Sequence, residues 1–374
     1  MDLRRSILTF LLAAAAALPL PAQESSSWFR RTVNRLAAPP SRLDTAAVLR
    51  LRPRWNAAVV ESLRRSGVSQ TYSFDWKGTP VSLQSGLREG VYTGLGLVVG
   101  YGGLTVGFNR QIGRSAVLSK GNSLDFCGSG FGFQAAYYET RQPLRYTLTA
   151  GNTGDPDRIV TEGETGDPGR LRLIILEGVY ALNRRDFSFG AVYKGNQVQR
   201  RSAGSWMLSA KYLQGEMMDS EEDGAAWLYL DLSRQAMSQA ALGGGYSYNI
   251  VALHRQGAAG DEKSLRNLTF NLTAIPLLGM YDRHVVTYAF PNSVTGDTGP
   301  RTARFQSTLR PNFVVRAGVA FSLDRCFLNL TARLDGLSFG GSGKLVGLGG
   351  SVVDVKTAGR FNEWTTALKF RVRF

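Results

Sequence analysis

Long hydrophobic runs are missing from the sequence after its N-terminal segment. Beyond residue 23, no stretch approaches the ~20 apolar residues that a helix needs to cross a hydrocarbon layer ~30 Å thick. This excludes a helical membrane protein. The remaining way to span lipid is a closed β-sheet, because only helices and closed barrels satisfy every backbone polar group internally.

Cysteine is almost absent. The two cysteines of the 374 residues, Cys127 and Cys326, lie in separate strand-like segments. An exported protein can pair its cysteines, but the geometry of a disulfide is demanding. We therefore expect two small, buried or half-buried residues, with a disulfide as the alternative.

Histidine is equally rare, since His254 and His284 are the two in the chain. Catalysis on a lipid would need a hydroxyl nucleophile, a histidine and a carboxylate or amide together. Ser247 precedes His254 and Asp282 precedes His284, but no nucleophile motif surrounds either pair. The sequence predicts no enzyme, no metal site and no cofactor.

Acidic residues are outnumbered. The chain carries 29 acidic and 44 basic side chains, which gives a formal net charge of +15. No nucleic-acid-binding motif accompanies this charge, so nucleic acid is not an expected partner. For an exported chain the charge favours anionic partners, namely outer-membrane lipid, lipopolysaccharide and small anionic solutes.

The N-terminus has the three parts of a secretory signal. Residues 1–6 are basic, residues 7–20 are apolar and residues 21–23 read Pro-Ala-Gln. This order predicts a cleaved signal peptide over residues 1–23, with a retained anchor helix as the alternative. Residues 24–54 are basic and interrupted by Pro39-Pro40, and we interpret them as a periplasmic leader.

The C-terminal segment alternates with a period of two, which is typical of a β-strand. One face of this strand is apolar and ends on a terminal phenylalanine. It carries Trp364, Leu368, Phe370, Val372 and Phe374. A strand that stops on a terminal Phe resembles the signal by which the barrel-assembly machinery recognises outer-membrane barrels.

The opposite face of such strands carries cations. Arg316 and Arg333 alternate with apolar residues in segments 313–322 and 326–335, and the terminal strand adds three more basic residues. An arginine that faces lipid at mid-depth costs about 2–4 kcal/mol. We therefore expect five cations in the lumen or at a rim, where they would make any conductance anion-selective. These are Arg316, Arg333, Lys369, Arg371 and Arg373.

Strand-like segments follow one another from residue 55 to the end. The remaining candidates are 55–64, 69–76, 91–99, 102–109, 122–128, 131–140, 171–182, 203–214, 238–251, 268–274 and 345–355. An alternative for 122–140 is one bent strand. Because bacterial barrels have even strand numbers, we predict an all-β, closed antiparallel transmembrane β-barrel of about 12 strands, within a range of 10–14. The barrel would occupy residues 55–374, with short turns at 100–101, 324–325 and 358–360.

Several segments resemble a known family. The most specific is Arg201-Ser202-Ala203-Gly204-Ser205, and GLVVGYGGLTVGF at 96–108 and LGGGYSYN at 242–249 add to it. With Asp44-Thr45 ahead of the first strand, residues 44–374 resemble the domain of unknown function 4421 family. This resemblance implies a Bacteroides-group outer-membrane barrel with no established activity.

Together these observations predict an outer-membrane β-barrel of a Gram-negative bacterium. Its expected role is passive solute passage or a structural or surface function. One alternative is a lipid-modifying outer-membrane enzyme, which would need a histidine-based site that the sequence does not supply. The other is a soluble periplasmic β-sandwich binding protein, against which the terminal Phe and the unbroken series of strands argue.

Overall fold

The computed structural model describes residues 31, 44–51, 55–112, 118–128, 130–164, 169–218, 231–255, 265–289, 299–307, 309–346 and 351–374. The predicted signal peptide, residues 1–23, lies outside the described residues, as does most of the predicted leader. Among the residues described, none forms a helix that is both long and apolar enough to cross a membrane.

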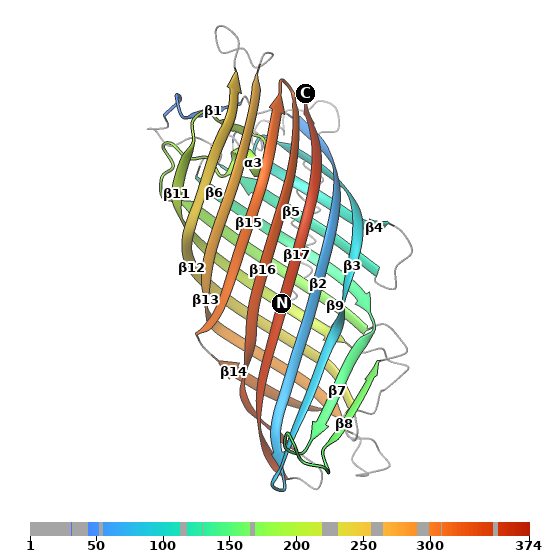
Figure 1. Ribbon diagram of the computed structural model, residues 1–374. Helices are drawn as coiled ribbons and strands as arrows, with labels where there is room; N and C mark the ends of the chain where they lie inside the picture. Colours follow the sequence, from blue (N-terminus) through green and yellow to red (C-terminus); the bar gives the residue numbers. More distant parts are fainter. Residues whose placement is uncertain are drawn as a thin grey trace.

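Within the described ranges, twelve antiparallel strands close into a ring (Figure 1). In chain order they are β2 (Trp55–Trp76), β3 (Thr79–Tyr101), β4 (Leu104–Ile112), β5 (Leu118–Cys127), β6 (Phe131–Gln142), β9 (Gly169–Ala181), β11 (Ala203–Met218), β12 (Asp231–Arg255), β13 (Arg266–Ala289), β15 (Arg310–Leu323), β16 (Cys326–Val346) and β17 (Val352–Arg373). Each strand pairs with the next, and β17 pairs with β2 to complete the barrel. The predicted fold class and strand number are confirmed.

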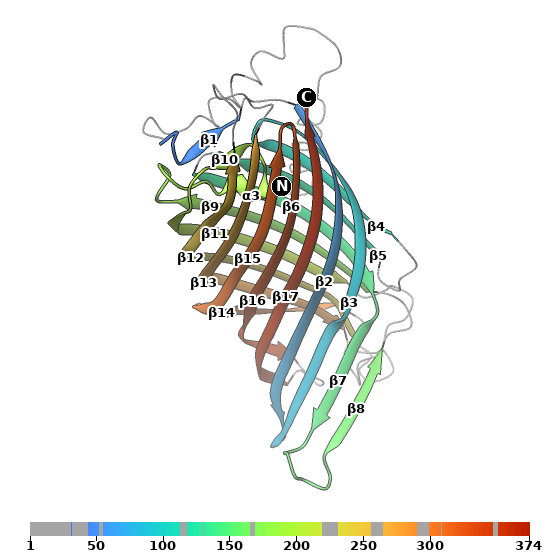
Figure 2. The same ribbon diagram turned by 45° about the horizontal axis from the view of Figure 1, so that its top comes forward.

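The remaining elements lie at the two ends of the barrel. At one end β7 (Leu144–Ala150), β8 (Ile159–Glu164) and β14 (Arg301–Ser307) lengthen the wall. At the other end, near the C-terminus, lie the short helix α3 (Gly190–Tyr193) and the paired strands β1 (Val48–Arg50) and β10 (Gln197–Gln199) (Figures 1 and 2). We call these the extended end and the terminal end.

Several predicted boundaries were wrong. Segments 55–64 and 69–76 form the single strand β2, and segment 345–355 spans the connection between β16 and β17. Residues 122–140 form two strands with a turn, in which the Gly128 amide donates to the Phe131 carbonyl at 2.8 Å.

The turns near 100–101 and 324–325 lie at the terminal end, between β3 and β4 and between β15 and β16.

The predicted turn at 358–360 is the clearest error, because these residues lie inside β17. The glycine in this segment, which favours a turn in the sequence, faces the lumen beside an aromatic ring. A Cβ on Gly359 would lie 2.2 Å from a ring carbon of Phe339. Gly359 therefore makes room for a packed side chain and does not reverse the chain.

Alternation along the strands gives the barrel an apolar outer surface. Large hydrophobic side chains from different strands are exposed there, such as Leu97 at 60%, Leu272 at 62% and Leu330 at 49%. This is the reverse of a water-soluble β-sandwich, whose apolar face is buried between sheets. The closed ring and its outer surface therefore exclude the β-sandwich alternative.

The inward face changes character along the barrel axis. Towards the extended end it is apolar and forms two clusters. We call the inner one the apolar cap, which comprises Val68, Leu87, Ala136, Leu144, Leu171, Leu173, Ile175, Leu213, Met217, Met237, Leu337, Phe339 and Phe361. Beyond it lies an outer cluster with Tyr72, Leu83, Val286, Tyr288, Ala303, Phe305, Leu345 and Val355. Towards the terminal end, the inward face becomes charged.

Candidate functional site

The terminal mouth of the barrel is filled by residues 182–202, the connection between β9 and β11, together with residues 44–51. We call these two segments the plug. Its apolar side chains Phe187, Val192 and Val198 are buried. Val192 packs with Ala320 of β15 and Phe327 of β16. The plug is therefore an integral part of the lumen and not a loop above it.

Inward asparagines of the wall hold the plug by its backbone. Asn249 Nδ2 donates to the Ser188 carbonyl at 2.8 Å, and Asn267 Nδ2 donates to the Gln199 carbonyl at 2.8 Å. Asn329 Nδ2 donates to the Val192 carbonyl at 3.1 Å. Since a buried backbone carbonyl without a partner is costly, these contacts fix the plug in one position.

Part of the predicted leader belongs to the plug. The strand β1 pairs antiparallel with β10, and the Arg200 amide donates to the Ala47 carbonyl at 2.7 Å. Val48 is fully buried. Residues 44–51 thus close the mouth from a position in the chain ahead of the first barrel strand.

The family-like motif at 201–205 joins the plug to the wall. Arg201 Nε donates to the Ala46 carbonyl at 3.3 Å, and Ser202 Oγ accepts from the Val251 amide at 3.0 Å. Ser205 Oγ accepts from the Asn183 amide at 2.9 Å. Between them, Ala203 and Gly204 start β11, and a Cβ on Gly204 would lie 2.1 Å from the Tyr246 hydroxyl. The motif has a structural explanation.

A layer of paired charges crosses the lumen between the plug and the apolar cap. We call it the charged layer, and it comprises Arg64, Glu177, Lys211, Arg316, Arg333, Asp335 and Glu363. Glu177 accepts from Arg316 and, at 2.6 Å, from Arg333. Bonds between ionised partners are the strong kind, so the layer is rigid.

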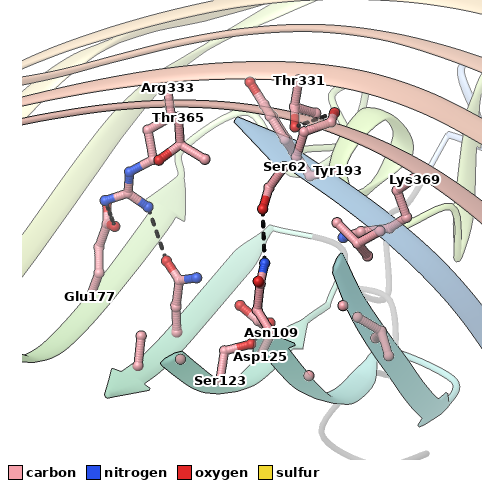
Figure 3. Close-up of a pocket in the computed structure, with 18 of the residues that line it drawn as sticks. Ser62, Asn109, Ser123, Asp125, Glu177, Tyr193, Thr331, Arg333, Thr365 and Lys369 are labelled. Atoms are coloured by element: carbon pink, nitrogen blue, oxygen red, sulfur yellow. Dashed lines mark hydrogen bonds and ion pairs between the residues drawn. The ribbon is translucent and has the colours of Figure 1, made fainter. Parts of the chain in front are cut away.

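The other contacts complete this network. Asp335 accepts from Lys211 Nζ at 2.7 Å and from Arg333 Nε at 2.5 Å. Arg64 Nη2 donates to Glu363 Oε2 at 2.7 Å. Arg333 also donates to Gln134 Oε1 at 2.9 Å, and Figure 3 shows Arg333 beside Glu177. Each acid of the layer is therefore bound by at least one cation.

The structure places all five predicted lumen cations on the inward face. Arg316 and Arg333 belong to the charged layer. Arg371 donates to the Lys194 carbonyl, and Arg373 Nη2 donates to the Asp324 carbonyl at 2.5 Å. Lys369 lines a cavity. Four of the five are thus held by protein acceptors and are not free in a water-filled channel.

The cavity beside Lys369 has a volume of about 280 Å³ and lies between the charged layer and the plug (Figure 3). Its floor includes Tyr193 and Lys194 of the plug, and Lys194 Nζ pairs with Asp125 Oδ1 at 3.2 Å. Tyr193 donates to Asn271 Oδ1 at 2.7 Å. Burial raises the pKa of the Tyr193 phenol to about 12, so this group stays a neutral donor.

Small inward residues on β2, β3, β4 and β5 leave the space for this cavity. They include Ser62, Gly96, Gly107, Gly121 and Ser123. A Cβ on Gly107 would lie 2.8 Å from Ser123 Oγ, so a larger residue at position 107 would crowd the neighbouring strand. The glycine-rich segment 96–108 thus shapes a cavity wall.

The predicted assembly signal lies on the outer surface. Trp364, Leu368, Phe370 and Phe374 are exposed, and Val372 is half-buried. The Phe374 amide donates to the Trp55 carbonyl at 3.0 Å, so the chain end is tied to the first strand of the ring.

The residues that we considered for catalysis are dispersed. Ser247 Oγ shares a hydrogen bond of 2.6 Å with Thr273, while His254 Nε2 accepts from Arg200 Nε at 3.2 Å. His284 contacts Gln70 Nε2 at 2.8 Å. In the part of the chain that is described, these contacts assemble no nucleophile, histidine and acid at one point.

The cysteines and possible metal ligands give no further site. Cys127 is buried and Cys326 half-buried, and both are free, so the disulfide alternative is not formed. Across the described ranges, no group of three His, Cys, Asp or Glu side chains could hold a metal ion.

Sequence reasoning missed the acids of the charged layer and the plug. Glu177, Asp335 and Glu363 lie at inward positions of their strands, so their position opposite the apolar outward set was the available signal. The plug had no such signal, because its residues form a connection without lasting period.

Comparison with solved structures gives low sequence identity. The outer membrane protease OmpT from Escherichia coli matches with 9% identity and a TM-score of 0.43, covering 85% of this chain and 97% of that chain. The translocator domain of the autotransporter NalP from Neisseria meningitidis matches with 10% identity and a TM-score of 0.30, covering 97% and 98%. A Pseudomonas aeruginosa FadL homologue matches with 12% identity and a TM-score of 0.23, covering 86% and 90%.

No curated protein gives a significant match to the sequence. A family model described as a domain of unknown function, DUF4421, matches residues 84–260. That range holds the glycine-rich wall, the motif at 201–205 and the plug connection at 182–202. The match of residues 84–260 supports the family that the sequence resemblance indicated.

Proposed function

We propose that this protein is an outer-membrane β-barrel with a closed lumen, which has a structural or surface-binding role and does not pass solutes freely. The observation that carries the proposal is the filling of the lumen at successive levels. Plug, charged layer and apolar cap follow one another along the axis. The proposed role includes no enzymatic activity.

The outer surface supports a membrane location. The side chains of β17 that face outward between Trp364 and Phe374 are mainly large and apolar. They include Leu368, Phe370 and Val372. Ten residues of strand rise ~33 Å, which at the usual tilt of ~40° spans ~25 Å of membrane. This equals the height of the apolar band of outer-membrane barrels.

Aromatic side chains support the placement of the terminal end at one membrane interface. Trp206, Tyr246 and Tyr248 are exposed on the outer surface near that end, as is Phe374. Such residues gather at both interfaces of outer-membrane barrels. With its short turns, the terminal end corresponds to the periplasmic side.

A row of charges on the outer surface supports contact with lipopolysaccharide. Lys120 and Glu139 are paired residues of β5 and β6, and the same row continues through Arg172 and Glu216. Lys120 Nζ lies 3.1 Å from Glu139, and Arg234 lies 2.6 Å from Glu216. Lys120 and Arg234 are exposed and lie beyond the apolar surface, where they would meet lipid phosphates.

The apolar cap supports a closed lumen. A conducting barrel has a polar, water-filled interior. Here Leu213, Leu337 and Phe361 face inward from three strands and are at most 2% exposed. Ions would have to displace this packed cluster, and the loss of buried apolar contacts makes that unfavourable.

The test is reconstitution of the purified protein into planar bilayers. We expect fractionation with the outer membrane, heat-modifiable migration on gels and no conductance steps. Stable conductance steps would show an open lumen and favour passive solute passage. Recovery in the soluble periplasmic fraction would refute the membrane location, and lipid hydrolysis that is lost in His254→Ala or His284→Ala would refute the non-enzymatic role.

Assembly should depend on the last residue. Phe374→Ala is expected to lose most of the heat-modifiable, assembled form, because the terminal Phe presents the recognition signal. Phe270→Ala, which changes another exposed aromatic residue on the outer surface, should keep it. Quantitative immunoblots of unheated samples measure both, and equal assembly of the two variants would contradict the idea.

A further inference from the structure

We propose that the cavity beside Lys369 is a binding site for a small oxyanion, a solute that bears a carboxylate or phosphate group. The cavity lies between the charged layer and the plug, and its volume is about 280 Å³. This is just below the usual range of small-molecule sites, which begins at about 300 Å³. It is therefore large enough for a small organic acid or inorganic phosphate.

The charge balance of the lining favours an anionic ligand. The acids that line the cavity already have cations: Glu177 binds Arg316 and Arg333, Glu363 binds Arg64, and Asp125 binds Lys194. Asp335 binds Arg333 and Lys211. Each acid that lines the cavity is therefore already paired with a cation.

Lys369 is the cation that remains. No hydrogen bond or ion pair joins its ammonium to another residue that the structure describes. Its surroundings include the cations Lys194 and Arg371 as well as Asp125. A cation held away from bulk water without a counter-charge is unfavourable, so an anion in the cavity would be stabilised.

Hydroxyl groups around Lys369 can serve the remaining oxygens of such an anion. Ser62, Ser123 and Thr331 line the cavity, and the hydrogen bonds that their hydroxyls donate are long, at 3.4, 3.3 and 3.4 Å, although Ser62 Oγ also accepts from Asn109 Nδ2 at 2.8 Å. Hydroxyl bonds in proteins usually measure 2.5–3.0 Å. These three donors are thus weakly committed and can turn to a ligand. Figure 3 shows them together with Lys369.

The plug fills the terminal end, so a ligand would have to reach the cavity from the side of the extended end. The strands β4 and β5 have 9 and 10 residues, and their described residues contribute nothing to the apolar cap or the outer cluster. In the proposed outer-membrane orientation, a ligand would arrive from outside the cell and be held, not passed on.

The inference rests on the proposed function only for the side of access, because binding can be measured in detergent without any membrane. The folded full-length protein would be titrated calorimetrically with glycolate and, separately, with inorganic phosphate, in a buffer of uncharged or cationic components. We expect saturable binding of at least one of them. Comparison of the two titrations distinguishes a carboxylate from a phosphate ligand.

Lys369→Met removes the charge and keeps most of the side-chain volume. We expect affinity to fall at least about tenfold, since hydrogen bonds to charged groups contribute about 1.5–3 kcal/mol. The matched control is Lys356→Met, which changes an exposed lysine of the same strand and should leave binding unchanged. Heat-modifiable migration confirms that each variant is folded.

Glycolamide, the neutral analogue of glycolate, tests the inference on the wild type alone if Lys369→Met fails to fold. It should bind at least about tenfold more weakly than glycolate. Absence of saturable binding of both anions, equal binding of glycolamide, or full affinity in Lys369→Met would overturn the site. If the protein shows neither conductance nor binding, the anion site is refuted and the closed barrel is kept. If it shows both conductance and binding, the closed barrel is refuted and the anion site is kept.

Discussion

Phe361→Ala is expected to lower the free energy of unfolding by about 3–5 kcal/mol, although residue 361 faces the lumen of a barrel. Phe361 is completely buried in the apolar cap, where it packs with Leu337 and Phe339 of the neighbouring strand. Its removal leaves a cavity that the rigid barrel wall cannot close. Urea unfolding in liposomes, followed by tryptophan fluorescence, measures the change.

The matched control is Phe370→Ala on the same strand. Phe370 is 49% exposed on the outer surface and contacts no packed protein core. Its loss should cost clearly less, because fluid lipid refills the space. A change below about 1 kcal/mol for Phe361→Ala would contradict the packed cap and indicate a hydrated lumen.

Glu177→Ala should be similarly damaging, at about 3–5 kcal/mol. Glu177 is the acceptor for both Arg316 and Arg333, and its side chain is 2% exposed. Without it, two guanidinium groups in the lumen lose their shared counter-charge. The same unfolding measurement applies, and the cost should be smaller in an Arg316→Met background, where one of these cations is gone.

An exposed ion pair provides the comparison. Glu164 pairs with Arg145 at 3.1 Å, with side-chain exposures of 36% and 56%. Water screens this pair, so Glu164→Ala should change stability by no more than about 0.5–1 kcal/mol. If the two glutamate variants were equally mild, the charged layer would have to be solvated and the lumen more open than described.

The terminal strand shows how far the sequence could predict the fold. The period-two pattern of 364–374 identified which residues face outward, and the same reasoning led to a ring of twelve strands. The prediction succeeded because the apolar residues of that segment lie mainly on the outer surface. The prediction needed no knowledge of the lumen.

The extended end could not be predicted in the same way, because the pattern reverses there. In β17 the apolar residues shift from even positions after 363 to Val353, Val355 and Phe361. In β16 they shift to Leu337 and Phe339. The outward positions at this end are polar, as at Lys356 and Arg360, so here the barrel resembles a water-soluble sheet folded around its own core.

The candidate site was even less predictable. Lys369 could be placed on an inward face from its spacing, but its lack of a partner depends on the acids that other cations occupy. These pairings join strands that are distant in the chain, such as Arg333 with Glu177, 156 positions apart. A single sequence does not specify such contacts.

The ion pair between Arg64 and Glu363 has a consequence for how the ring closes. These residues are 299 positions apart and lie on the first and last strands, whose pairing is the final seam of the barrel. A slip of two residues at that seam would keep every side chain on its proper face, so the apolar pattern alone cannot prevent it. In the observed register Arg64 lies opposite Thr365 and Glu363 lies opposite Ser66, so a slip in one direction would set the two charges directly opposite each other, and a slip in the other direction would separate them inside the lumen. Arg64 and Glu363 therefore disfavour one of the two possible slips, and with it one change in the shear at which the barrel closes.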